Sequence, residues 1–136
     1  MKWRREVIVN VFGELPSKEL LNENLKYYRR HIEDETHLAF IAYYDGCPSG
    51  CGAVCLTDEL PSPDNPTGHC AYLMNIYVRE EFRAKGIAHA IVKRLIEESK
   101  NRDCGKIYLE TTPEGRGVYE SLEFRDLPDM MKLKEE

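Results

Sequence analysis

The stretch Tyr72–Ala88, YLMNIYVREEFRAKGIA, decides the fold. It ends an apolar run that begins at Cys70 and contains a single polar residue, as is typical of a strand covered on both faces. After a polar turn, apolar residues recur every three to four positions, as on one face of a helix: Ile87, Ala88, Ile91, Val92, Leu95 and Ile96. The stretch therefore predicts a central strand over Cys70–Val78, a loop, and a helix that ends near Lys100.

The loop between strand and helix, Arg83–Ala88, has the form R-x-x-G-x-A. Amide groups in the first turn of a helix have no partner within the helix, and the helix dipole adds positive potential there. Such a turn favours an anion, above all phosphate, and Gly86 has no Cβ to keep a diphosphate away from the backbone. A turn that needs glycine only for its shape is the other interpretation. A P-loop is disfavoured because no G-K-[ST] follows.

Two further segments and a hairpin are predicted before this stretch. Trp3–Phe12 fits both a helix face and an alternating strand. A firmer helix follows Ser17, its expected N-cap, because apolar residues recur at helical spacing: Leu21, Leu25, Tyr28 and Ile32. His37–Tyr44 and Gly52–Thr57 are then predicted to pair as a hairpin.

A short strand, a short helix and a further extended segment are predicted after it. They cover Lys106–Thr111, Gly115–Leu122, and Phe124–Lys134, which we expect to form one or two terminal strands. This order of elements predicts a mixed α+β fold with a central, mostly antiparallel sheet flanked by helices. No linker, repeat or low-complexity segment divides the chain, so we expect residues 1–136 to form one domain.

Composition excludes several classes of function. The chain has 136 residues, 42% of them hydrophobic, and a net charge of −5. An acidic balance argues against nucleic-acid binding, which needs a basic face toward the phosphates. No apolar run approaches the 18 residues of a membrane span, and no signal-peptide pattern opens the chain. We therefore expect a soluble, cytoplasmic protein with no membrane partner.

The five cysteines predict reduced thiols rather than disulfides or a metal site. Their number is odd, and no secretory signal accompanies them. Cys47, Cys51 and Cys55 form a C-x3-C-x3-C series, which lacks the two-residue spacing common in zinc and iron–sulfur sites. We therefore expect no metal.

Three landmarks in this order resemble the GNAT superfamily of N-acetyltransferases. Tyr72–Ala88 resembles its fourth strand followed by the Q/R-x-x-G-x-G/A motif, and Lys106–Glu110 resembles its fifth strand. Gly117–Phe124, GVYESLEF, resembles the family's LYEKLGF-type element. The resemblance implies a GNAT-like fold and an acetyl-CoA-dependent N-acetyltransferase.

The same resemblance implies a site in which acetyl-CoA lies between splayed fourth and fifth strands. Its pantetheine arm would follow the strand edge at Ile76, Tyr77 and Val78, and its pyrophosphate would bind the amides of Arg83, Ala84, Lys85, Gly86, Ile87 and Ala88. The Val78 amide would stabilise the oxyanion, and Tyr119 would protonate the departing thiolate.

The resemblance implies direct attack by a primary amine of a small molecule or peptide within a ternary complex. A lysine-like amine is almost wholly protonated at neutral pH, so a general base would help. We assign no general base. The nearby candidates are three carboxylates and a histidine: Asp58, Glu59, His69 and Glu110. The alternative is a non-catalytic acyl-CoA-binding or regulatory module.

Two departures from the family pattern matter. Glu123 stands where the family has a glycine, which disfavours a tight turn with positive φ. The strand that precedes the first family helix is expected to be missing, because the N-terminal segment aligns with that helix. The edge of the Leu38–Tyr44 strand would then be open, and we expect a homodimer partner or Trp3–Phe12 to cover it.

Overall fold

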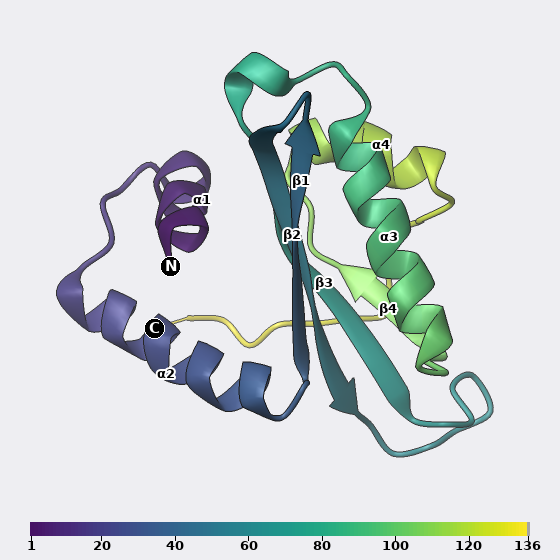
Figure 1. Ribbon diagram of the computed structural model, residues 1–136. Coiled ribbons are helices and arrows are strands. Elements are labelled where there is room, and N and C mark those ends of the chain that lie inside the picture. Colours follow the sequence, from purple (N-terminus) through teal and green to yellow (C-terminus); the bar gives the residue numbers. More distant parts are fainter. Residues whose placement is uncertain (136) are drawn as a thin grey trace.

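The computed structural model describes residues 1–135. It has a central sheet with one layer of helices on each face (Figure 1). In chain order its elements are α1 (Lys2–Phe12), α2 (Lys18–Glu33), β1 (His37–Tyr44), β2 (Cys47–Asp58), β3 (His69–Val78), the 3-10 turn η1 (Glu80–Phe82), α3 (Ile87–Asn101), β4 (Lys106–Leu109), the 3-10 turn η2 (Pro113–Gly115) and α4 (Arg116–Ser121). The predicted strand, loop and helix over 70–100 are confirmed.

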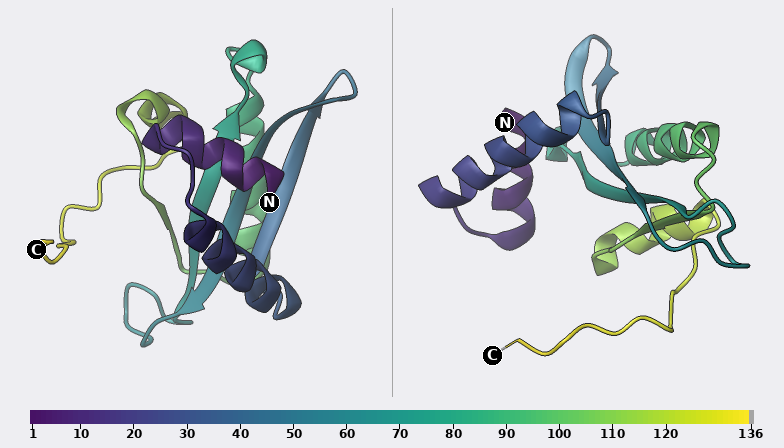
Figure 2. Two further views of the ribbon diagram at one scale, coloured as in Figure 1. Left: turned by 90° about the vertical axis from the view of Figure 1, so that its left-hand side faces the viewer. Right: turned by 90° about the horizontal axis from the view of Figure 1, so that it is seen from below.

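The sheet has the order β1-β2-β3-β4. The first three strands are antiparallel, and β4 runs parallel to β3. Helices α1 and α2 lie across one face of the sheet, while α3 and α4 cover the other (Figures 1 and 2). The predicted mixed α+β fold is confirmed, and no strand precedes α1 in the described residues.

The main core lies between the sheet and α3. Its fully buried apolar members come from β2, β3 and α3: Val54, Ala71, Leu73, Val92 and Leu95. Gly50 and Gly52 allow α3 to approach β2 closely, because a Cβ at either position would meet the Ile91 side chain. This packing fixes the start of α3 relative to the end of β3, where the predicted site lies.

The N-terminal segment is helical, which settles its ambiguous pattern. Gly13 ends α1 in the left-handed region with φ 72°. Ser17 is the N-cap of α2, as predicted, and its Oγ accepts a hydrogen bond from the Leu20 amide at 3.1 Å. Helix α1 contacts β3 rather than the outer edge of β1, so the expectation that Trp3–Phe12 covers that edge is wrong.

The C-terminal segment differs from its prediction. Phe124–Lys134 forms no strand in the described chain, where β4 pairs with β3 alone. Met131 and Leu133 are 98% and 91% exposed, because this segment lies away from the sheet (Figure 2). An extended segment without a partner has no ladder of hydrogen bonds to stabilise it as a strand.

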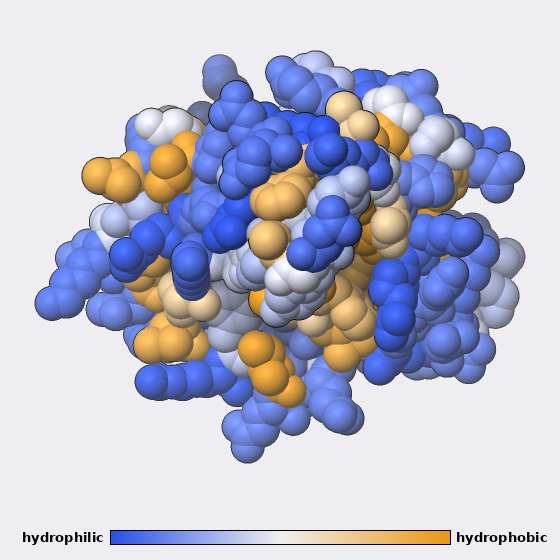
Figure 3. All heavy atoms as spheres, turned by 45° about the horizontal axis from the view of Figure 1, so that its top comes forward, coloured by the Kyte–Doolittle hydropathy of each residue, from blue (hydrophilic) through white to orange (hydrophobic). Residues whose placement is uncertain are grey.

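The surface carries scattered apolar side chains. Figure 3 shows one face, on which small apolar groups are separated by hydrophilic ones. None of the helices within residues 1–135 is long and apolar enough to cross a membrane.

Candidate active site

A β-bulge interrupts β3 at Asn75. Cys51 lies opposite Tyr77, whereas Ala53 lies opposite Met74, so β3 has one residue more than β2 in this interval. Asn75 has φ 57°, in the left-handed region that asparagine tolerates better than most residues. A bulge changes the direction of the groups that follow it. The lone polar residue of the apolar run is the sequence signal that could have located this bulge.

The backbone N–H and C=O groups of Val78 point away from β2. The Arg79 amide donates to the Ser49 carbonyl at 2.9 Å, which makes these two residues a hydrogen-bonded pair. Such pairs alternate along antiparallel strands, so Val78 and its partner Gly50 form a non-hydrogen-bonded pair. The same alternation directs the Tyr77 amide toward β2. Of these two amides, only that of Val78 is therefore directed away from β2.

Strands β3 and β4 separate before they reach this point. Their pairing covers Cys70–Leu73 on β3 and Lys106–Leu109 on β4. Beyond Leu73, the outer edge of β3 has no strand partner among residues 1–135. The Val78 amide is thus on an open strand edge, as the resemblance implied.

The loop after β3 presents several free amides. Ala84 has φ 62° and Gly86 has φ 77°, and Gly86 is the N-cap of α3. Within the described chain, the amides of Ala84–Ala88 have no backbone or side-chain acceptor. Free N–H groups in the loop and first turn that open a helix suit an anion.

Side chains hold this loop against the end of the sheet. Arg83 Nε donates to the Val78 carbonyl at 3.0 Å, so the loop binds the same residue whose amide is exposed on the strand edge. The Tyr44 ring lies 6.1 Å from the Phe82 ring, and Lys85 Nζ lies 5.1 Å from the Tyr44 centroid. The predicted cofactor-binding residues of β3 and of the loop are therefore neighbours.

Tyr119 lies on α4, which covers the same face of the sheet as α3. Its ring packs against the core and against Phe124, with 6.0 Å between the ring centroids. A Cβ on Gly115 would approach this ring to 3.1 Å, so glycine gives it room. Burial raises the pKa of Tyr119, which keeps the phenol protonated at neutral pH. In the described residues its hydroxyl makes no hydrogen bond to the protein.

The turn after α4 forms despite the glutamate. Glu123 has φ 71°, and the Phe124 amide donates to the Tyr119 carbonyl at 3.0 Å. This is the position after a helix where glycine is usual. The positive-φ turn therefore forms in spite of Glu123, and the expected disfavouring remains as backbone strain at this residue.

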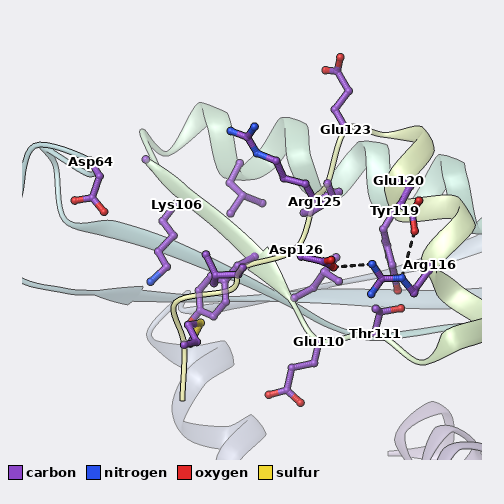
Figure 4. Close-up of a pocket in the computed structure, with 17 residues that line it drawn as sticks. Asp64, Lys106, Glu110, Thr111, Arg116, Tyr119, Glu120, Glu123, Arg125 and Asp126 are labelled. Carbon is purple, nitrogen blue, oxygen red and sulfur yellow. Dashed lines mark hydrogen bonds and ion pairs between the residues drawn. The ribbon is translucent and has the colours of Figure 1, made fainter. Parts of the chain in front are cut away.

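A cavity of about 710 Å³ lies beside β4 and α4 (Figure 4). Tyr119 and Glu110 line it, whereas no residue of 76–88 does. At its rim Arg116 pairs with Asp126 at 2.6 Å and with Glu120 at 3.3 Å. The cavity therefore adjoins the α4 side of the candidate site rather than the loop with free amides.

Three of the four candidate general bases lie at the wrong end of β3. His69 and Asp58 pair with each other at 2.9 Å, and Glu59 pairs with Lys106 at 3.3 Å. Val78 lies nine positions after His69 along β3, which corresponds to about 30 Å of extended strand. Glu110 directly follows β4 and shares the cavity with Tyr119.

The cysteine series does not converge. Cys47 is exposed in the hairpin, while Cys51 and Cys55 are buried along β2, and all are free thiols. Across residues 1–135, no three metal-ligating side chains come together.

These features define an α+β protein in which a bulged strand leads into a loop with free amides and a helix, while a parallel strand splays beside it. The chain belongs to the acetyltransferase (GNAT) family, whose model matches residues 5–124. The match begins within α1 and includes all of α2, so it is longer than the three landmarks.

The chain is similar to known proteins in sequence and in fold. Thialysine N-epsilon-acetyltransferase of Sus scrofa is 27% identical over 144 residues, covering 90% of this chain and 79% of the relative. A protein of Clostridium acetobutylicum described as a predicted acetyltransferase, solved with acetyl-CoA, has a TM-score of 0.85 and 27% identity, covering 97% of this chain and 84% of its own. A GCN5-related N-acetyltransferase of Ralstonia eutropha has a TM-score of 0.80 at 18% identity, covering 97% and 89%.

Proposed function

We propose that this chain transfers an acetyl group from acetyl-CoA to a primary amine by direct attack in a ternary complex. The observation that carries the proposal is the Val78 amide, which points away from β2 on an open strand edge. A thioester carbonyl oxygen gains negative charge as an amine adds to its carbon. A fixed backbone N–H is suited to stabilise that charge.

The chain's residues fit acetyl-CoA as the donor. The free amides of Ala84–Ala88 suit its diphosphate, and the edge of Ile76–Val78 suits its pantetheine amides. Tyr77 borders this edge but directs its own amide to β2, so we assign the main-chain contact near the thioester to Val78. A structural relative solved with acetyl-CoA supports this donor.

Tyr119 is the proposed acid. When the amine nitrogen forms its bond to the carbonyl carbon, the carbon–sulfur bond breaks, and the sulfur takes the phenolic proton of Tyr119. The amine's surplus proton passes to solvent, from which Tyr119 is reprotonated. A raised pKa and a hydroxyl with no hydrogen bond to the protein in the described chain support this role. We assign no general base, although Glu110 lies in the same cavity.

The proposed acceptor is the amine of a small molecule or a peptide, in the cytoplasm. A relative named thialysine N-epsilon-acetyltransferase supports the small-molecule class. The outer edge of β1 has no strand partner in the described residues, which supports a homodimer of one-domain subunits.

Thermal unfolding with acetyl-CoA, CoA or ATP tests the donor. A ligand at 100 times its dissociation constant adds about 2.7 kcal/mol to the free energy of unfolding, or roughly ten degrees in a domain of this size. We expect such a shift with acetyl-CoA and little with ATP, and thiol release with some member of a panel of amines. No shift at millimolar acetyl-CoA would contradict the proposal. Binding without thiol release from any amine would favour a non-catalytic acyl-CoA-binding module.

A further inference from the structure

Helix α1 binds β3 on both sides of the edge Ile76–Val78. Before this edge, Arg4 Nη1 donates to Asn75 Oδ1 at 2.9 Å. After it, Arg79 donates to both carboxylate oxygens of Glu6, from Nε at 3.0 Å and from Nη2 at 3.1 Å. Arg4 and Glu6 both belong to α1. Each contacts a residue that directly flanks the edge Ile76–Val78.

The middle of this contact is aromatic. The Trp3 ring meets Tyr77 edge-on, with 6.4 Å between centroids, and the Arg79 guanidinium lies 4.3 Å from the Trp3 centroid. Val7 and Ile8 are the buried residues of α1. The helix is therefore packed against the protein rather than tethered by polar groups alone.

The polar contacts are of the kind that fixes geometry. Two parallel N–H···O bonds between a planar guanidinium and a carboxylate define both distance and orientation. The Glu6 and Arg79 side chains are only 27% and 22% exposed, so water screens their pair less than a surface pair. Arg4 is fixed in turn by α2, because its Nε donates to Asn24 Oδ1 at 2.9 Å.

We propose that Arg4 and Glu6 are positioning residues, which hold Asn75 and Arg79 and thereby direct the Val78 amide. This inference rests on the proposed function. Asn75 holds the bulge at φ 57°, a conformation that needs support from its surroundings. Arg79 follows Val78 directly, so a shift of its side chain turns the neighbouring peptide. Misplacing a reacting group by about 1 Å can cost 100-fold in rate.

Glu6→Gln is the main test, and Glu98→Gln is its matched control. Glu98 is also paired with arginines, Arg102 at 2.7 Å and Arg94 at 3.2 Å, and is 20% exposed, but it lies on α3 with both partners away from the site. We expect Glu6→Gln to lower kcat about tenfold with KM for acetyl-CoA within about twofold, because the lost interaction acts in the transition state. Glu98→Gln should leave both constants unchanged at a similar loss of Tm.

A charge exchange separates positioning from mere stability. Glu6→Arg combined with Arg79→Glu should recover most of the kcat that either single variant loses. Arg4→Lys keeps the charge but lacks the planar guanidinium that donates to the side-chain oxygens of Asn24 and Asn75 together. We therefore expect kcat to fall as in Glu6→Gln.

Amide hydrogen exchange tests the contact between α1 and β3 without a measurement of enzyme activity. The Tyr77 amide, which is directed toward β2, should exchange faster in Glu6→Gln than in Glu98→Gln, which should match the wild type. The inference would be overturned if Glu6→Gln kept the wild-type kcat and the wild-type exchange rate. It would also be overturned if Glu98→Gln lost as much kcat as Glu6→Gln, or if the double variant with Glu6→Arg and Arg79→Glu recovered no kcat. A wild-type protein that does not bind acetyl-CoA would instead overturn the proposed function, while the exchange comparison would still decide whether α1 holds the strand.

Discussion

The Tyr27 hydroxyl lies 2.9 Å from Nδ1 of His37 and joins α2 to β1. The His37 side chain is buried, and its Nε2 has no hydrogen-bond partner among the described residues. The rings of Tyr27 and Tyr28 each meet it edge-on at 5.2 Å. Burial lowers the pKa of His37, and the charges of His31 and Arg4 lower it further.

The lowered pKa of His37 predicts a loss of stability in mild acid. Because this pKa is lower in the folded than in the unfolded chain, the unfolded state binds more protons between the two values. The free energy of unfolding should therefore fall as the pH drops below about 6.5, the ordinary value for histidine, and level off below the folded pKa. Urea unfolding at pH 7.5 to 5 should show this dependence in the wild type and much less of it in His37→Gln.

The control for this experiment is His89→Gln, since His89 is exposed on α3. It should keep the wild-type dependence on pH. Parallel curves for His37→Gln and the wild type would exclude His37 as the source of the acid sensitivity.

Strain at Glu123 predicts a stabilising substitution. Its φ of 71° costs a residue with a Cβ about 1 kcal/mol relative to glycine. We expect Glu123→Gly to raise the free energy of unfolding by about 0.5–1 kcal/mol, measured by urea unfolding. Glu123→Ala removes the same carboxylate but keeps the Cβ, so a similar gain in that variant would trace the effect to charge instead.

Tyr119→Phe tests the proposed acid. Loss of a general acid typically costs about 100-fold or more in kcat. The ring should keep its packing against Phe124, so acetyl-CoA affinity by titration calorimetry should change little. Tyr43→Phe, an exposed tyrosine on β1, is the control. Unchanged turnover in Tyr119→Phe would assign the proton transfer to another group.

The sequence predicted the parts of the fold that depend on local pattern. The apolar run to Val78 and the helical spacing after Gly86 are local signals, and the structure confirms both elements. The alternation Met131-Lys132-Leu133-Lys134 also reads as a strand, but a strand needs a neighbour, and none pairs with it in the described chain.

The support of the candidate site by α1 could not be predicted in this way. Arg4 and Asn75 are 71 residues apart, and no local pattern relates them. The outward direction of the Val78 amide depends on the register with β2, which a bulge at Asn75 shifts by one residue. Motifs located the residues, whereas long-range pairing oriented them.

Gly86 and Gly46 provide a matched pair for the proposed phosphate loop. Gly86 has φ 77° at the N-cap of α3, and Gly46 has φ 80° in the β1–β2 turn. A Cβ at either position would meet no atom within 4 Å, so the strain of substituting alanine is nearly the same at both sites. Each alanine variant should therefore lose about 1 kcal/mol of stability.

Only Gly86→Ala should weaken the binding of acetyl-CoA. At this position alone would the added Cβ and the altered backbone meet a diphosphate on the amides of Ala84–Ala88. We expect its dissociation constant for acetyl-CoA to rise at least about tenfold, or 1.4 kcal/mol, while Gly46→Ala binds as the wild type does. Calorimetric titration of both variants with acetyl-CoA and with dephospho-CoA, which retains the diphosphate, measures the effect. Equal affinity in the two variants would show that the loop at Gly86 serves only as a turn between β3 and α3, and the diphosphate would then have to bind elsewhere on the chain.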